Sequence, residues 1–197
     1  MPDLSTDITR RAYHGTDRLD FTRFDMTHVN PFNIGLHFGT RTAAESRIVY
    51  LREENPTASC RILTCELTLE NPLRVDDIFG HSYAGFFDVL EREIGRAQTL
   101  AAPLRRSYET LLGSWMSADD NPHFQKDPSL YHAFNQKLNV EIRRLFQKLG
   151  YDGFVYRNEL EAGEFAADSC CVFTTSQVAV KGEEMVQYYD PCADRVA

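Results

Sequence analysis

The sequence has no surplus of positive charge, and this absence excludes a large class of functions. Lysine and arginine number 21 against 29 aspartate and glutamate residues, which gives a net charge of −8 at pH 7 and an isoelectric point near 5.2. Proteins that hold duplex DNA or follow RNA by neutralising phosphates need a Lys/Arg surplus on one face. We therefore do not expect nucleic acid as a partner.

Long apolar runs and cysteine pairs are also missing. No uninterrupted apolar stretch is long enough to cross a bilayer, and the N-terminus, MPDLSTDITRR, lacks the apolar core of a signal peptide. The five cysteines form no CxxC pair and leave an odd one, which favours reduced thiols over a disulfide framework or a zinc site. These features predict a soluble protein with no metal and no membrane partner, in the cytoplasm or delivered into the cytosol of a host cell.

The sequence does contain enough apolar residues for one sizeable core, 43% of 197 positions. In RILTCELTLENPL, the apolar residues at 63, 65, 67 and 69 share one face, which predicts a half-buried strand that stops at Asn71-Pro72. The segments RRAYHGT and GLHFGT near the start, and YDGFVYRN and SCCVFTTSQVAVKG near the end, are also predicted to be strands.

The middle of the chain has helical periodicity instead. The segment YAGFFDVLEREIGRAQ spaces its apolar residues as a helix does, and a longer apolar stripe runs from Leu130 to Leu149 and is closed by Gly150. Thr40 or Thr42 can cap a further helix over AAESRIVYL. We find no internal repeat or linker. The prediction is one α+β domain, residues 1–197, with a helical insertion at about 78–149.

Two histidines stand at predicted strand ends. His14 directly precedes Gly15 and Thr16, which offer an exposed amide and a hydroxyl, and His37 lies in the next predicted strand. An imidazole beside a glycine can hydrogen-bond a ligand near neutral pH. A lone histidine is more often a satisfied core residue, but the two together indicate a site. The remaining histidines are expected at the surface: His28, His81, His123 and His132.

The segments YHGT and GLHFGT, with a helix after the second, resemble the start of the ADP-ribosyltransferase fold in its diphtheria-toxin and poly(ADP-ribose) polymerase branch. That branch carries a His, Tyr, Glu motif on three strands. CRILTCELTLENPLRVDD and LGYDGFVYRNELEAGEFAADSCCVFTTSQVAVKG resemble a strand and the ending of ADP-ribosyltransferase-like domains in phage polyvalent proteins and bacterial effectors. The resemblance covers about residues 11–76 and 145–182. It implies two small packed sheets with an NAD cleft between them.

The resemblance also implies roles for individual residues. His14 would hydrogen-bond the adenine-side ribose of NAD, and the Gly15 backbone would hold the nicotinamide amide, with Thr16 nearby. His37 falls where the family has its tyrosine, and its flat ring can stack on nicotinamide as a phenol ring does. The other residues expected to contact NAD are Phe38, Asn158 and Ser169, while Arg157 is expected either at the pyrophosphate or in solvent.

The third motif position has a serine instead of a glutamate. The alignment places Ser169 where the family has its catalytic carboxylate. Loss of nicotinamide leaves an oxocarbenium-like C1′, which an anion on the 2′-hydroxyl would stabilise. Asp168 is one candidate, although strand alternation turns it to the other face unless a bulge intervenes. Glu161 is the preferred candidate, because Gly163 lets its loop fold inward. The other loop candidates are Glu159 and Glu164, and each of the three loop residues is otherwise a solvated carboxylate.

Three functional hypotheses remain at this point. The first is a mono-ADP-ribosyltransferase that moves ADP-ribose from NAD to a protein, as a bacterial or phage effector or toxin does. The second is an RNA 2′-phosphotransferase-like enzyme, whose His–His pairing is similar and against which the acidic charge argues. The third is a catalytically inactive binding module, which the missing glutamate favours. Expected partners are NAD, a protein acceptor, and an immunity protein or chaperone.

Overall fold

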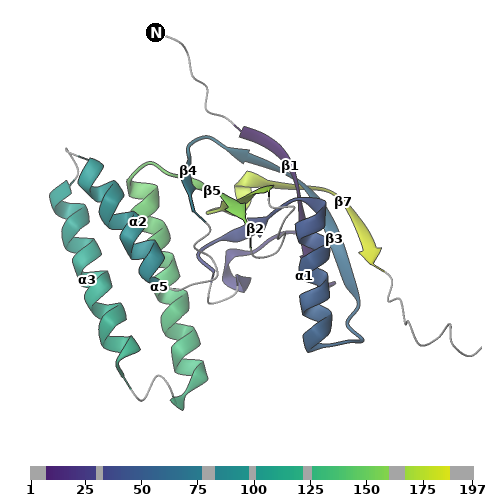
Figure 1. The fold of residues 1–197 in the computed structure, drawn as a ribbon, viewed down its shortest axis with the longest axis horizontal. Coiled ribbons are helices and arrows are strands. Elements are labelled where there is room, and N and C mark those ends of the chain that lie inside the picture. Colours follow the sequence, from purple (N-terminus) through teal and green to yellow (C-terminus); the bar gives the residue numbers. More distant parts are fainter. Residues whose placement is uncertain are drawn as a thin grey trace, which may run out of the picture.

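The computed structural model describes residues 8–29, 33–76, 83–97, 101–121, 126–159 and 167–186, and the structural statements below concern these ranges. They form a mixed α+β fold with two small sheets, as Figure 1 shows. The strands are β1 (Ile8–Thr16), β2 (Leu36–Phe38), β3 (Cys60–Leu69), β4 (Pro72–Val75), β5 (Gly153–Asn158), β6 (Ala167–Val172) and β7 (Val178–Val186). The helices are α1 (Arg41–Glu54), α2 (Tyr83–Arg96), α3 (Ala101–Asp119) and α5 (Pro128–Lys148), with short 3-10 turns η1 (Met26–His28) and η3 (Thr175–Gln177).

The three-stranded sheet has the order β1-β3-β7, and all its pairs are antiparallel. Its central strand, β3, buries Leu63, Cys65, Leu67 and Leu69, as the alternation in the sequence predicts. Ile62 is also buried, because the first half of β3 packs against Ala44 and Ile48 of α1 on its other face. The strand predicted to be half-buried is therefore buried on both faces over its first half.

The four-stranded sheet has the order β2-β6-β5-β4. Its strands β4 and β5 are parallel neighbours, and parallel neighbours need a long crossover connection. The helical insertion predicted at about 78–149 supplies that crossover as α2, α3 and α5. Asp152, just before β5, accepts hydrogen bonds from the backbone amides of Glu70 (2.6 Å) and Asn71 (3.1 Å), which fixes the turn into β4.

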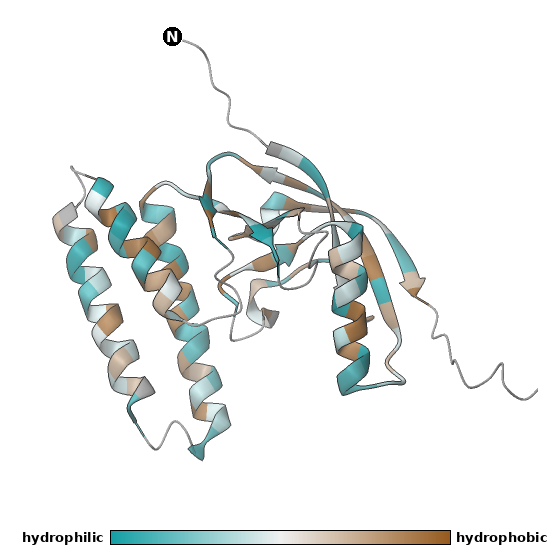
Figure 2. Cartoon of the chain, in the orientation of Figure 1, coloured by the Kyte–Doolittle hydropathy of each residue, from teal (hydrophilic) through white to brown (hydrophobic). Residues whose placement is uncertain are grey.

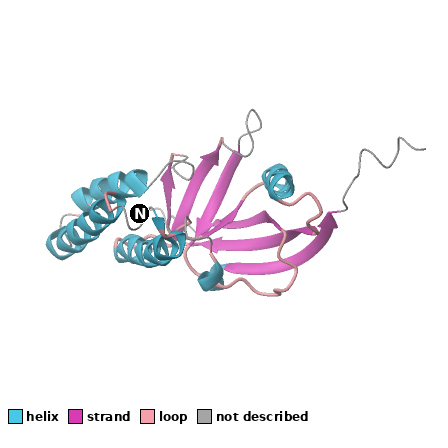
Figure 3. Ribbon diagram, turned by 90° about the horizontal axis from the view of Figure 1, so that it is seen from below, coloured by secondary structure: helices cyan, strands magenta, loops and turns pink. Residues whose placement is uncertain are grey.

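The helices α2, α3 and α5 lie together on one side of the strands (Figure 3). Their apolar faces join the four-stranded sheet in one core, in which Phe146 and Phe154 pack edge to face with ring centroids 4.8 Å apart. Figure 2 shows hydrophilic and hydrophobic residues interspersed along the helices. Among the described residues, no helix combines the length and the hydropathy that a membrane crossing requires.

The two sheets meet where β1 passes β2. A single bridge joins them: the Tyr13 amide donates to the Gly39 carbonyl at 2.9 Å, and the Gly39 amide donates to the Tyr13 carbonyl at 3.0 Å. Helix α1 begins just after this bridge, capped by the Thr40 hydroxyl. It approaches β1 so closely that a Cβ at Gly15 would lie 2.3 Å from the Ala44 carbonyl oxygen. The glycine after His14 is therefore required by helix packing.

Candidate functional site

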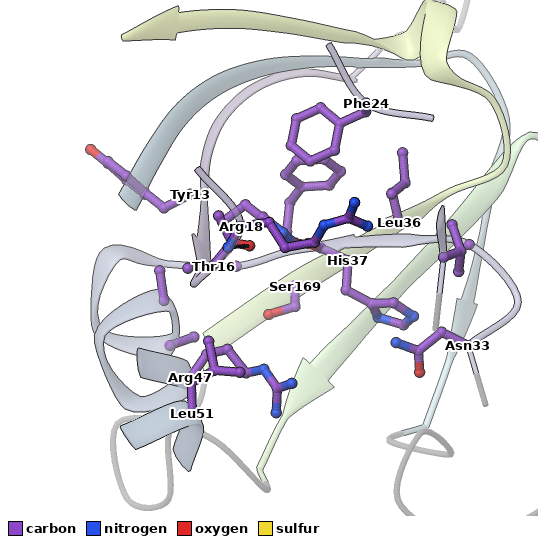
Figure 4. Close-up of a pocket in the computed structure, with 18 of the residues that line it drawn as sticks. Tyr13, Thr16, Arg18, Phe24, Asn33, Leu36, His37, Arg47, Leu51 and Ser169 are labelled. Atoms are coloured by element: carbon purple, nitrogen blue, oxygen red, sulfur yellow. Dashed lines mark hydrogen bonds between the residues drawn. The ribbon is translucent and has the colours of Figure 1, made fainter. Parts of the chain in front are cut away.

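A cavity of about 520 Å³ opens at the junction of the two sheets (Figure 4). Its walls are the ends of β1 and β2, the loop 17–25, one face of α1, and residues of β5 and β6. Residues that are far apart in the sequence meet here. The sequence-predicted residues that line the cavity are His14, Gly15, Thr16, His37, Phe38, Asn158 and Ser169.

His14 is fixed by its neighbour strand. Its Nδ1 lies 2.9 Å from the backbone carbonyl oxygen of His37, and because a carbonyl can only accept, Nδ1 carries the hydrogen. Burial, and then the positive charges of Arg47 and Arg61, lower the pKa of His14 below its ordinary value despite that hydrogen bond. The ring is therefore neutral at pH 7, and its Nε2 has a lone pair to accept a hydrogen bond.

His37 is held by a side chain of the four-stranded sheet. Its Nδ1 lies 3.0 Å from the hydroxyl of Tyr156 on β5, and the two rings meet edge to face at 5.9 Å. Burial, with a smaller contribution from His14, lowers the pKa of His37 to about 3. Both histidines are thus neutral at pH 7. The sequence analysis missed Tyr156, although its place two residues before Asn158 puts the two on one face of the strand.

Ser169 and Asn158 form a buried polar pair on adjacent strands. The Asn158 amide nitrogen lies 3.4 Å from Ser169 Oγ, and both side chains are buried. A Cβ at Gly39 would lie 2.8 Å from the same Oγ, so the glycine lets β2 pass close to this hydroxyl. The pair offers neutral hydrogen-bonding groups to the cavity. It supplies no negative charge at the third motif position.

The predicted carboxylates do not join the cavity in the described residues. Asp168 lies on the other face of β6, where both its oxygens accept from the Arg74 guanidinium at 3.0 Å. The pairing of β5 with β6 is regular from 167 to 172, so no bulge turns Asp168 inward. Arg157 is exposed and forms an ion pair of 3.7 Å with Glu159. Three loop residues lie outside the described ranges: Glu161, Gly163 and Glu164.

The cavity also includes a loop that the sequence analysis did not assign to the site, residues 17–25. Phe24 of this loop packs on His14, with ring centroids 5.2 Å apart. Buried Arg61 of β3 donates to the Phe21 carbonyl oxygen and to the Glu183 carboxylate, the latter at 2.6 Å, and stacks on the Phe21 ring at 4.9 Å. A buried cation therefore holds the loop over the cavity. The charged residues of this loop that line the cavity are Asp17, Arg18, Asp20, Arg23 and Asp25.

Among the described residues, four cysteines and His132 do not line the cavity. Cys60, Cys65, Cys170 and Cys171 are buried free thiols, and burial raises the pKa of Cys65 to about 12. His132 is exposed on α5. Within the described ranges, no group of three His, Cys, Asp or Glu side chains is arranged to hold a metal ion. The side chain of His28 lies outside the described set, as do residues His81, His123 and Cys192.

The cavity therefore combines neutral imidazoles, a buried hydroxyl and amide, aromatic rings and arginines. Neutral donors and acceptors suit sugar hydroxyls, flat rings suit a heterocycle, and guanidinium groups suit phosphate. This chemistry fits a nucleotide. A scan against protein-family models, a search of curated proteins and a search of solved structures each gave no match for the chain.

Proposed function

We propose that this cavity binds NAD and that the chain transfers the ADP-ribose of NAD to a protein acceptor, on an ADP-ribosyltransferase-like fold. One observation carries the proposal. His14, His37 and Ser169, which align with the three motif positions, come from three different strands and line one cavity at the junction of two small sheets. The order of the segments in the sequence does not by itself require these three side chains to meet at one cavity.

The residues have complementary tasks in this proposal. The lone pair at His14 Nε2 accepts a hydrogen bond from a ribose hydroxyl, and the Gly15 backbone holds the nicotinamide amide. The His37 ring, oriented by Tyr156, contacts the nicotinamide ring. In the reaction, the bond from C1′ to the nicotinamide nitrogen breaks and nicotinamide leaves with the electron pair. A nucleophilic side chain of the acceptor then bonds to C1′ and loses its proton to solvent.

The oxocarbenium-like C1′ requires a nearby anion. Glu161 stays the preferred candidate from the sequence, and the structure adds Asp17, which follows Thr16 directly and lines the cavity. Asp20 forms an ion pair of 3.7 Å with Arg18, and Asp25 accepts a hydrogen bond from the Thr27 amide at 2.8 Å.

We expect either Glu161→Gln or Asp17→Asn to reduce nicotinamide release by roughly 10²-fold with little change in NAD affinity. Asp168→Asn is the matched control, because its carboxylate is held by Arg74 on the far face of β6. The assay is nicotinamide release by purified protein, measured by chromatography, beside NAD affinity measured by calorimetry. Full turnover in both test variants would exclude both acids.

Ser169 favours a second candidate function, an NAD-binding module without catalysis. Its hydroxyl contributes no charge where the family has a carboxylate. In that case the parent protein binds NAD but releases no nicotinamide, and Ser169→Glu confers release while Ser169→Gln, of the same shape but neutral, does not.

The decisive experiment uses labelled NAD with and without a host-cell lysate. Transfer of label to a lysate protein supports the first function, and NAD binding without nicotinamide release supports the second. No NAD binding at millimolar concentration would contradict both.

A further inference from the structure

Three arginines line the cavity, from two different walls. Arg18 and Arg23 belong to the loop after β1, and Arg47 belongs to α1. Figure 4 shows the Arg18 and Arg47 side chains coming from these two walls. Ala43, Arg47 and Leu51 follow one another at intervals of four along α1, so the helix presents this arginine on its cavity-lining face.

The arginines that line the cavity differ from Arg41 of α1 in their partners. Arg41, on the outer side of α1, forms ion pairs of 2.9 Å with both Glu45 and Glu184. Within the described ranges, Arg47 has no carboxylate in ion-pairing distance, and neither has Arg23. Arg18 has only Asp20, at 3.7 Å. In a chain with eight more acidic than basic residues, cations without close carboxylate partners at a cavity wall indicate an anionic ligand.

The charge of one of these arginines acts on His14, which is half-buried. Besides burial, which is the larger cause, the charge of Arg47 lowers the pKa of His14. Arg47 and His14, the ring that we assign to the ribose, line the same cavity. A ligand that contacts both His14 and Arg47 would have a sugar next to a negatively charged group.

We infer that Arg47 and Arg18 bind the diphosphate bridge of a nucleotide ligand, one guanidinium from each wall. The inference rests on the NAD-binding function proposed above and assigns two residues to its phosphates. Guanidinium groups donate two parallel hydrogen bonds to phosphate oxygens, and two of them on separate walls match the two phosphates of a dinucleotide. Asp20 holds Arg18 only at 3.7 Å, so phosphate can replace it as the partner.

The experiment measures binding by calorimetry with three probes: NAD, ADP, which keeps the diphosphate but lacks nicotinamide riboside, and adenosine, which has no phosphate. We expect ADP to compete with NAD and adenosine to bind at least 10-fold more weakly than ADP. Arg47→Gln and Arg18→Gln should each weaken ADP and NAD about 10-fold, leave adenosine unchanged and reduce the salt dependence of ADP binding. Arg47→Lys should be intermediate, because it keeps the charge and loses the planar fork.

Arg41→Gln is the matched control, because it removes a charge from the same helix outside the cavity. The two arginines substituted in the test variants, Arg18 and Arg47, line the cavity at exposed positions, so thermal unfolding of these variants should match the parent. Unchanged ADP and NAD affinities in Arg47→Gln and Arg18→Gln would overturn the inference while NAD binding stands. ADP binding without NAD binding would instead refute the proposed function and keep the diphosphate site. Stronger competition by an oligoribonucleotide with a 2′-phosphate than by ADP would assign the arginines to RNA phosphate and overturn the inference.

Discussion

The cavity and the three-helix insertion differ in how their polar side chains are paired within the protein. In the insertion, the buried carboxylate of Glu93 accepts from Arg92 at 3.0 Å, Arg96 at 2.8 Å and the Tyr151 hydroxyl at 2.8 Å. Burial alone would raise the pKa of Glu93, but the hydrogen bonds from Tyr151 and Arg92, together with the Arg96 charge, lower it. A carboxylate so fully engaged is structural.

The cavity has the complementary pattern. Arg47 and Arg23 have no close carboxylate in the described ranges. Each histidine is held through its Nδ1, that of His14 by the His37 carbonyl oxygen and that of His37 by the Tyr156 hydroxyl. Polar groups that satisfy one another stabilise a fold, whereas polar groups that converge on open space are available to a ligand. The difference separates the part of the molecule that supports the fold from the part that we propose binds a ligand.

The largest expected effect tests this separation with one histidine from each region. His14→Ala should reduce nicotinamide release by about 10²-fold or more, because it removes the acceptor for the ribose hydroxyl. His132→Ala, on the exposed surface of α5, should leave release within a factor of two of the parent. Kinetics of both variants, with circular dichroism to verify folding, provide the measurement. Equal losses in the two variants would place the site elsewhere.

Local sequence patterns predicted β3, the helical insertion and the two strands that carry His14 and His37. Period-two alternation located β3, helical periodicity located the insertion, and the YHGT and GLHFGT segments identified His14 and His37 before any contact between them was visible. These signals are local, because strands and helices repeat over two to four residues. The direction of Asp168 also follows from simple alternation in an unbulged strand, which is why it points away from the cavity.

The residues that were missed act through contacts distant in sequence. Arg61 lies in a strand 40 positions from the Phe21 carbonyl that it holds and 122 positions from Glu183. Tyr156 is 119 positions from His37. No periodicity encodes such a pair, since the partners are set by the sheet register. For Arg47 a signal existed: it follows Ala43 by four residues, so the two lie on the same face of the predicted helix.

A second prediction uses the protonation of the half-buried His37 imidazole. The pKa of His37 is about 3 in the folded protein against an ordinary value of 6.5, so between these values the unfolded chain binds more protons. Stability is therefore complete above pH 6.5 and is lost as pH falls, by up to about 1.4 kcal/mol per pH unit from this group. His37→Gln should flatten the dependence between pH 6.5 and 5, and exposed His132→Gln should not.

Urea unfolding of the parent and both variants across this pH range gives the slopes. Carboxylates also make the protein less stable in acid, and they do so equally in the parent and the variant. Subtracting the variant's slope of unfolding free energy against pH from the parent's slope therefore leaves the contribution of His37. If the parent and His37→Gln have the same slope of unfolding free energy against pH, His37 is protonated in the folded protein. The assignment of a neutral His37 ring at the cavity would then be wrong.

The smallest expected effect concerns a buried amide of the insertion that does not follow this pattern. Asn135 of α5 is fully buried, and its side-chain amide makes no hydrogen bond within the described residues, whereas Asn139, one turn later, donates to the Asn33 carbonyl oxygen at 3.1 Å. A buried amide without a partner costs stability, so Asn135→Leu, close in shape and apolar, should raise the free energy of unfolding by about 1 kcal/mol. Asn139→Leu should lower it, because the Asn33 carbonyl loses its donor.

Urea unfolding of Asn135→Leu and Asn139→Leu, with NAD affinity measured on both, separates two explanations of the buried amide. If Asn135 is only a packing defect, its substitution stabilises the protein and leaves NAD affinity unchanged, and the division between a supporting insertion and a binding cavity holds. If Asn135→Leu lowers stability, the amide has a partner in the folded protein. If Asn135→Leu weakens NAD binding, the insertion takes part in the site. In that case the pairing of polar groups within the protein does not by itself distinguish the two regions.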